Sequence, residues 1–110
     1  MKYMIEYKVR QAGLSHDQNL TNWDALVRAF GQWEPAEGLT VHAFVAKLTD
    51  GGYVLVEANE PALVSSFVAK FLYWNDFDVI PVVEVANSVS VISEALAWTR
   101  GALSLDPPVG

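Results

Sequence analysis

The stretch that most constrains the fold runs from Gly38 to Ala58, GLTVHAFVAKLTDGGYVLVEA, because both of its halves are apolar and alternating. A period of two is typical of a β-strand, and Asp50-Gly51-Gly52 supplies the positive φ angles of a hairpin turn. With a two-residue loop, directly paired residues share a face. One face would then hold Val41, Ala43, Val45, Val54, Val56 and Ala58, and the other His42, Phe44, Ala46, Leu48, Tyr53, Leu55 and Glu57. A three-residue loop would mix the two sets.

A strand followed by a helix is predicted before this hairpin. Lys2 to Arg10 alternates and is rich in aromatic and β-branched residues, which favours a strand. Ser15 and Gln18 fit a capping box at the start of an amphipathic helix that ends near Glu34-Pro35.

A helix followed by a strand is predicted after the hairpin. Asn59-Glu60-Pro61 is typical of a helix start, and this second helix is expected to end near Trp74-Asn75-Asp76. Phe77 to Ala86 predicts a strand, and Pro81 restricts it to a sheet edge or a bulge. A last helix is expected from Asn87 or Ser88 to a C-cap at Gly101.

This order of elements predicts an α+β, ferredoxin-like β-α-β-β-α-β fold with an added C-terminal helix. Right-handed crossovers place the first two helices on one face of an antiparallel sheet with strand order 4-1-3-2. We expect one domain over residues 1–101 and a flexible tail over residues 102–110.

Composition excludes several functions. Seven Lys and Arg residues against a net charge of −6 argue against nucleic-acid binding. The absence of Cys excludes disulfides and thiolate metal sites, and no motif with metal-ligand spacing is present, so we expect neither a metal nor a cofactor. No apolar run is long enough for a membrane span, and the alternating MKYMIEYKVR does not resemble a signal peptide, so a cytoplasmic protein is expected.

The sheet face turned away from the helices is predicted to be half apolar. Its expected members are Met4, Glu6, Lys8, His42, Phe44, Tyr53, Leu55, Glu57, Ile80, Val82 and Glu84. Leaving even 500 Å² of apolar surface in water would forfeit about 12 kcal/mol. A second copy of the same sheet is the simplest cover, so we expect a homodimer through this face.

His42 is the candidate for chemistry on that face, because it is expected there with Glu6, Glu57 and Glu84. Enclosed in a dimer, a histidine beside carboxylates can act as an acid or base, contact a polar ligand, or bind a divalent metal. The alternative is that these groups only form hydrogen bonds and ion pairs at the interface.

Aromatic and apolar residues suggest a pocket between the sheet and the helices for a small apolar or aromatic ligand. The candidates are Phe44, Tyr53, Leu55, Trp33 and Trp74, with Glu84 as a polar neighbour. The alternative is that the aromatic side chains belong to the core, which is their commoner role.

The blocks MKYMIEYKVR, AFGQW, the hairpin sequence and FLYWNDFDVIPVVEV followed by EALAW resemble an uncharacterised family of short bacterial proteins. That family is similar in fold to the dimeric α/β-barrel superfamily, which includes cofactor-independent monooxygenases of aromatic substrates, haem-degrading enzymes and ligand-binding proteins. The resemblance implies this fold and provides no catalytic residues.

Three functions are therefore expected in order of preference. The first is a homodimer that binds a small organic ligand in a cavity on the sheet face. The second is a cofactor-independent monooxygenase or isomerase that uses His42 with Glu6 or Glu57. The third is a purely structural or regulatory dimer.

Overall fold

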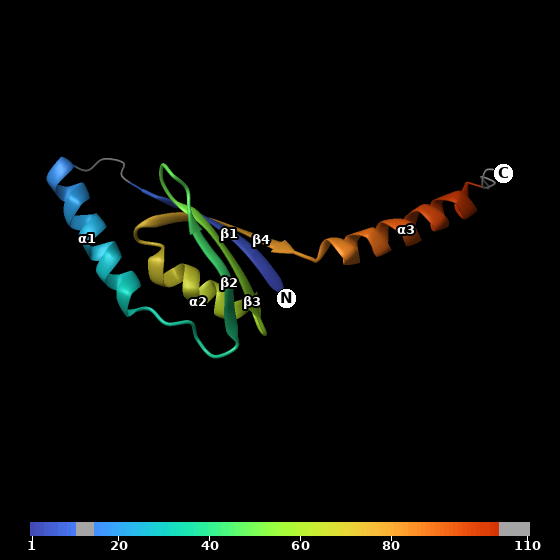
Figure 1. Ribbon diagram of the computed structural model, residues 1–110, viewed down its shortest axis with the longest axis horizontal. Coiled ribbons are helices and arrows are strands. Elements are labelled where there is room, and N and C mark those ends of the chain that lie inside the picture. Colours follow the sequence, from blue (N-terminus) through green and yellow to red (C-terminus); the bar gives the residue numbers. More distant parts are fainter. Residues whose placement is uncertain (11–14, 104–110) are drawn as a thin grey trace.

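The computed structural model describes residues 1–10 and 15–103, which form a four-stranded sheet and three helices (Figure 1). The elements are β1 (Lys2–Val9), α1 (His16–Gln32), β2 (Leu39–Ala46), β3 (Gly52–Ala58), α2 (Pro61–Phe71), β4 (Asn75–Val82) and α3 (Val85–Ala102). The first six follow the ferredoxin-like order, and α3 is the addition. Most of the predicted tail, residues 104–110, lies outside the described residues.

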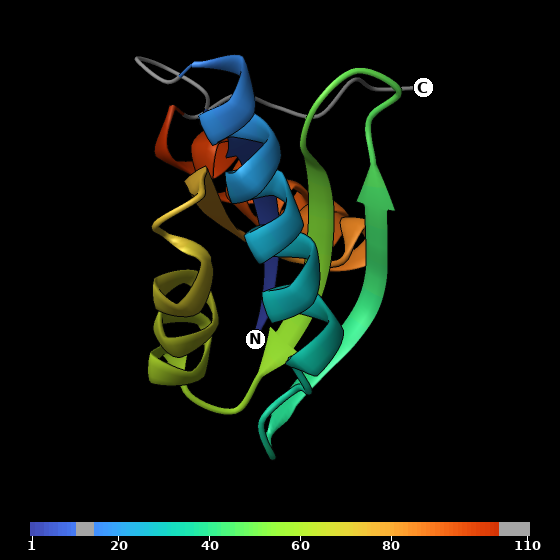
Figure 2. The same ribbon diagram turned by 90° about the vertical axis from the view of Figure 1, so that its left-hand side faces the viewer.

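The sheet is antiparallel with the order β2-β3-β1-β4, which is 4-1-3-2 when counted from the β4 edge. Helices α1 and α2 lie side by side over one face (Figures 1 and 2). Pro81 lies on β4, an edge strand, where its missing N–H costs no ladder hydrogen bond.

The core lies between the sheet and α2. Ile5, Val54 and Val56 on the two central strands are fully buried, and Phe67 and Phe71 of α2 pack over them. We call this side of the sheet the helix face and the opposite side the open face.

Local sequence signals set the helix starts. The Ser15 side chain accepts a hydrogen bond from the Gln18 N–H, and the Gln18 side chain accepts one from the Ser15 N–H, so the predicted capping box is confirmed. Pro61 occupies the first turn of α2 as predicted, where its missing N–H is tolerated.

The predicted boundaries of β4 and α3 were wrong. Strand β4 begins at Asn75, opposite Val9, and stops at Val82, opposite Lys2. Because β1 begins at Lys2, it offers no partner beyond Val82, and the chain turns into α3 at Val85 instead of Asn87. The helix also continues past Gly101 to a C-cap at Leu103.

The predicted faces of β2 were wrong for its second half. Val41 lies opposite Val56, but Ala43 lies opposite Leu55, so His42 is an extra residue that forms a β-bulge. Beyond the bulge the faces exchange: Phe44 lies on the helix face, and Ala43 and Val45 lie on the open face.

The loop of this hairpin is longer than the two residues assumed, because Ala46 pairs with Gly52. Gly51 has a φ of 74°, and a Cβ atom there would lie 2.0 Å from the Tyr7 carbonyl oxygen. Only glycine therefore lets the turn pass this close to β1.

Helix α3 leaves the sheet beyond β4 and extends away from the other elements (Figure 1). The molecule measures 70 × 32 × 20 Å with a radius of gyration of 20.7 Å, whereas a compact chain of this length has about 13 Å. Within the described ranges, no helix combines the length and apolar character that crossing a membrane requires.

Candidate functional site

A cavity with many aromatic lining residues, which we call the aromatic cavity, lies on the helix face, between α1, α2 and one end of the sheet, with a volume of about 310 Å³. Seven of its sixteen lining residues are aromatic. The aromatic lining residues are Tyr7, Trp23, Phe30, Phe44, Phe67, Phe71 and Phe77. A cavity of this size and lining suits a small organic ligand.

Phe44 stands at the centre of this aromatic wall because the bulge turns it toward the helices. Its ring centroid lies 5.2 Å from Phe30 and 5.6 Å from Tyr7, both in edge-to-face geometry. Such pairs stabilise one another beyond the area they bury.

The cavity stays open because α1 stands off the sheet. No residue of α1, a helix that is wholly described, is buried. Phe30 and Trp23 line the cavity and are nevertheless 45% and 36% exposed. Apolar area on both sides of the cavity is thus available to a ligand.

Two polar side chains of the cavity wall have a buried oxygen without a hydrogen-bond partner among the described residues. Asn75 is 4% exposed; its Nδ2 donates to the Phe71 carbonyl over 3.2 Å, which leaves its Oδ1 unpaired. The Asp50 Oδ1 is unpaired in the same way. A buried acceptor left unpaired costs about 1–3 kcal/mol, so these atoms favour a ligand that brings donors.

Tyr7 is the titratable residue among the aromatic lining residues. Its hydroxyl donates a hydrogen bond to the Val45 carbonyl over 3.1 Å, and burial raises the pKa of the phenol. Tyr7 therefore stays neutral well above physiological pH.

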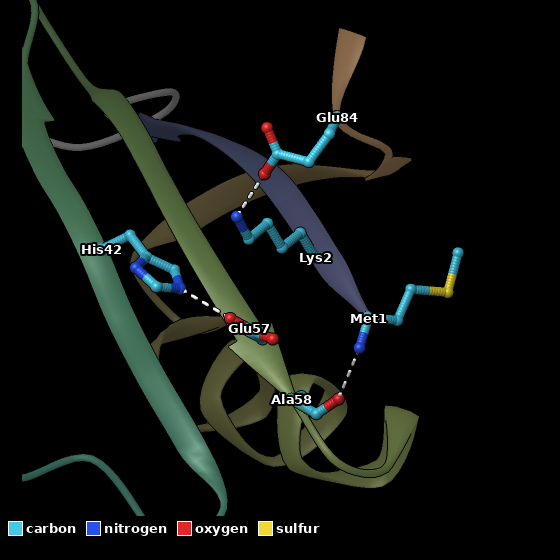
Figure 3. Close-up of polar contacts among 6 residues, drawn as sticks. All are labelled: Met1, Lys2, His42, Glu57, Ala58 and Glu84. Atoms are coloured by element: carbon cyan, nitrogen blue, oxygen red, sulfur yellow. Dashed lines mark hydrogen bonds and ion pairs between the residues drawn. The ribbon is translucent and has the colours of Figure 1, made fainter. Parts of the chain in front are cut away.

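A second group of polar residues lies at the opposite end of the sheet, on the open face (Figure 3). His42 Nε2 lies 2.9 Å from Glu57 Oε1, and Lys2 forms an ion pair with Glu84. The amino group of Met1 donates to the Ala58 carbonyl over 3.1 Å.

Pairing shifts the titration of these groups. The hydrogen bond with His42 lowers the pKa of the Glu57 carboxyl, and Lys2 lowers the pKa of Glu84 in the same way. The pKa of Lys2 is raised by Glu84 in return. Both side chains of the His42–Glu57 pair are more than one third exposed, so solvent screens them and their contribution to stability is small.

A family model described as a domain of unknown function, DUF3303, matches residues 1–96, most of the chain. The chain belongs to the DUF3303 family. No curated protein matches it. The matched region of this DUF3303 protein contains the whole sheet, α1, α2 and the first twelve residues of α3.

The structure separates the candidate catalytic residues of the DUF3303 chain. His42 and Glu57 contact each other, but the Glu6 carboxylate lies 3.6 Å from the Lys47 ammonium group instead. Glu84 pairs with Lys2. Within the described part of the chain, no three His, Cys, Asp or Glu side chains are grouped so that they could hold a metal ion.

Of the aromatic and apolar candidates, Phe44 lines the aromatic cavity. Trp33 and Trp74 line a separate, more open hollow of about 410 Å³ between α1 and α2. Tyr53 and Leu55 lie opposite Glu6 and Met4 on the open face, away from both hollows.

Sequence reasoning missed most of the cavity. Tyr7 alternates with Ile5, and Phe67 belongs to the apolar stripe of α2, so both could have been assigned to the helix face from periodicity. No sequence signal reports the unpaired oxygens of Asn75 and Asp50, because pairing depends on what tertiary contacts supply.

Proposed function

We propose that this DUF3303 protein binds a small aromatic molecule that carries hydrogen-bond donors, in the cavity between α1 and the helix face. The observation that carries the proposal is a cavity of about 310 Å³, rich in aromatic side chains, whose lining residues include Asn75 with its buried, unpaired Oδ1. The proposed site therefore differs from the cavity expected on the open face and lies on the side where a pocket between the sheet and the helices was also expected.

The walls support an aromatic ligand. A ring in the cavity would meet the edges and faces of Phe44, Phe30 and Phe77, and each such pair adds about 0.5–1.5 kcal/mol. It would also cover apolar surface of Trp23 and Phe30 that is now in contact with water.

The unpaired oxygens of Asn75 and Asp50 favour a ligand that carries hydrogen-bond donors. A hydroxyl or N–H group that reaches Asn75 Oδ1 or Asp50 Oδ1 would relieve the cost of a buried, unsatisfied oxygen. Such a bond contributes about 1–1.5 kcal/mol, which corresponds to roughly tenfold in affinity.

The test is calorimetric titration with a matched pair of probes, 2-naphthol and 2-methoxynaphthalene. They share the same rings, but only naphthol carries a donor. We expect both to bind and naphthol to bind about tenfold more tightly. If neither binds at millimolar concentration, the proposal fails. Equal affinities would leave an aromatic site and remove the donor requirement.

A matched pair of variants localises the site. Ala46 lines the cavity, whereas Ala43 lies three residues away on the open face of the same strand. Ala46→Trp fills the cavity and should abolish naphthol binding, while Ala43→Trp should leave it unchanged. Loss of binding in Ala43→Trp alone would place the site on the open face.

The second candidate, acid–base catalysis by His42, is supported by its 2.9 Å contact with Glu57, which would orient the imidazole. It needs a cover that excludes water, because both side chains are exposed in the single chain. We prefer ligand binding because its cavity is already present in one copy. In either case, a homodimer through the open face remains part of the proposal.

A further inference from the structure

Helix α3 is an 18-residue element without a cover. None of its residues, which are all described, is buried, and it points away from the sheet (Figure 1). In proteins, most of the stability of a helix comes from the packing of its apolar face rather than from helix propensity alone. This one contains three interior Val and Ile residues and several serines, which are poorer helix formers, so it needs tertiary contacts to persist.

One side of α3 carries a continuous row of apolar residues, whereas Val91 and Trp98 are single exposed residues on the other side. Val85, Val89, Ile92 and Leu96 recur at spacings of four, three and four residues, and Leu103 continues the same side. Each of the five is more than half exposed. We call these five residues the α3 stripe.

The open face of the sheet lacks a cover as well, within the described chain. Met4 lies at its centre, opposite Leu55 on one side and Ile80 on the other. Ala43 and Val45 extend this apolar centre onto β2 because of the bulge. Lys2 and Glu57 stand toward one end of the face, and Glu6 and Asp78 toward the other, so its apolar part forms a band in the middle.

We propose that α3 is an arm exchanged between two copies of this chain. The α3 stripe of each copy lies across the apolar band of the open face of the other copy. Only Val83 and Glu84 connect β4 to α3, and Glu84 has an extended backbone with φ −61° and ψ 141°. Its ion pair with Lys2 links this connection to β1, and the arm leads away from its own sheet (Figure 1).

The area agrees with what a stable dimer buries. The α3 stripe exposes roughly 500 Å², and a similar area of the open face would be covered beneath it. Two reciprocal contacts therefore bury about 2,000 Å², at the upper end of the range for specific interfaces. Because the exchange is reciprocal, a two-fold axis closes the assembly at two copies.

The arm belongs to the family domain, since the DUF3303 match continues along α3 to Leu96 and includes most of the stripe. The inference does not rest on the ligand cavity, which lies on the other face of the sheet. Either proposal can fail alone.

The first test measures particle mass by light scattering at micromolar concentration. We expect twice the chain mass of 12.1 kDa. Ile92→Glu places a charge in the middle of the stripe and should weaken the dimer about a hundredfold or more. The control is Ser90→Glu, which adds the same charge on the opposite side of the helix and should leave the mass unchanged.

The second test distinguishes arm exchange from other kinds of dimer. Because the chain contains no Cys, only the introduced cysteines can react with a cross-linker. Chains with Ala43→Cys are mixed with chains carrying Thr99→Cys, which flanks the stripe, and treated with a short bis-maleimide. Exchange predicts a cross-linked heterodimer in this mixture and none when Ser90→Cys replaces Thr99→Cys.

Three results would overturn the inference. The first is a 12.1 kDa particle, because the arm then has no second copy to cover. The second is a dimer that persists in Ile92→Glu. The third is cross-linking of a chain carrying both cysteines only within itself, which would mean that α3 folds back onto its own sheet.

Discussion

Phe44 is the residue whose removal best tests the bulge at His42. Without the bulge, Val45 would lie on the helix face and Phe44 would lie on the open face. With it, Phe44 contacts Phe30, Tyr7 and the helix α2, and Val45 does not. With the bulge, Phe44→Ala should therefore lower the free energy of unfolding more than Val45→Ala. Without the bulge, Val45→Ala would lower it more.

The cost of Phe44→Ala follows from its burial. The side chain is 37% exposed, so about 120 Å² of its roughly 200 Å² is removed from water. At 25 cal/mol per Å² this corresponds to a loss of about 3 kcal/mol in the free energy of unfolding. Val45 is smaller and 53% exposed, and its truncation should cost less than about 1 kcal/mol.

Urea unfolding monitored by circular dichroism measures both values. The midpoint should fall by about 2 M for Phe44→Ala and by under 1 M for Val45→Ala. Because Val45 lies on the face that we propose contacts a second copy, the urea titration is repeated at a tenfold lower protein concentration. The Phe44 effect should not change on dilution. A larger loss for Val45→Ala at both concentrations would refute the bulged register.

Three further predictions address the turn, the cavity and the first helix. Gly51→Ala should lower the free energy of unfolding by about 3 kcal/mol or more in urea titrations, since its Cβ would meet the Tyr7 carbonyl and its φ is positive; a loss below 1 kcal/mol would contradict the close approach. In absorbance titrations, the natural protein should show one tyrosine transition that is missing in Tyr7→Phe, and its midpoint should lie above the usual pH 10. The stability that neutral Tyr7 provides should be lost as the pH rises through this raised pKa. Ser15→Ala removes the N-cap of α1 and should cost about 1 kcal/mol in thermal unfolding, with Ser15→Asp as a control that retains the cap.

Much of the fold could be predicted from local sequence. The period of two in Lys2 to Val9, the Ser15–Gln18 capping box and Pro61 in a first turn are all effects of residues on their own segment of chain. Pro81 predicted an edge strand for a similarly local reason, namely that it has no N–H to donate.

The candidate site was predicted less well, because its members meet only through pairing between segments. One extra residue at His42 moved Phe44 from the open face to the cavity and moved Val45 the other way. Alternation along β2 contains no sign of that shift, since a bulge depends on how β2 pairs with β3. Glu6 and Glu57 were equivalent in sequence, but only Glu57 lies within reach of His42.

The sequence by itself determined which segments become strands and helices, because apolar period, caps and proline act within a few residues. It also determined that α3 carries an apolar stripe. Only the tertiary structure decided that α1 stands off the sheet and leaves an aromatic cavity, and that α3 projects with its stripe uncovered. Both depend on distances between segments far apart in the chain, and these are fixed by packing rather than by any local preference.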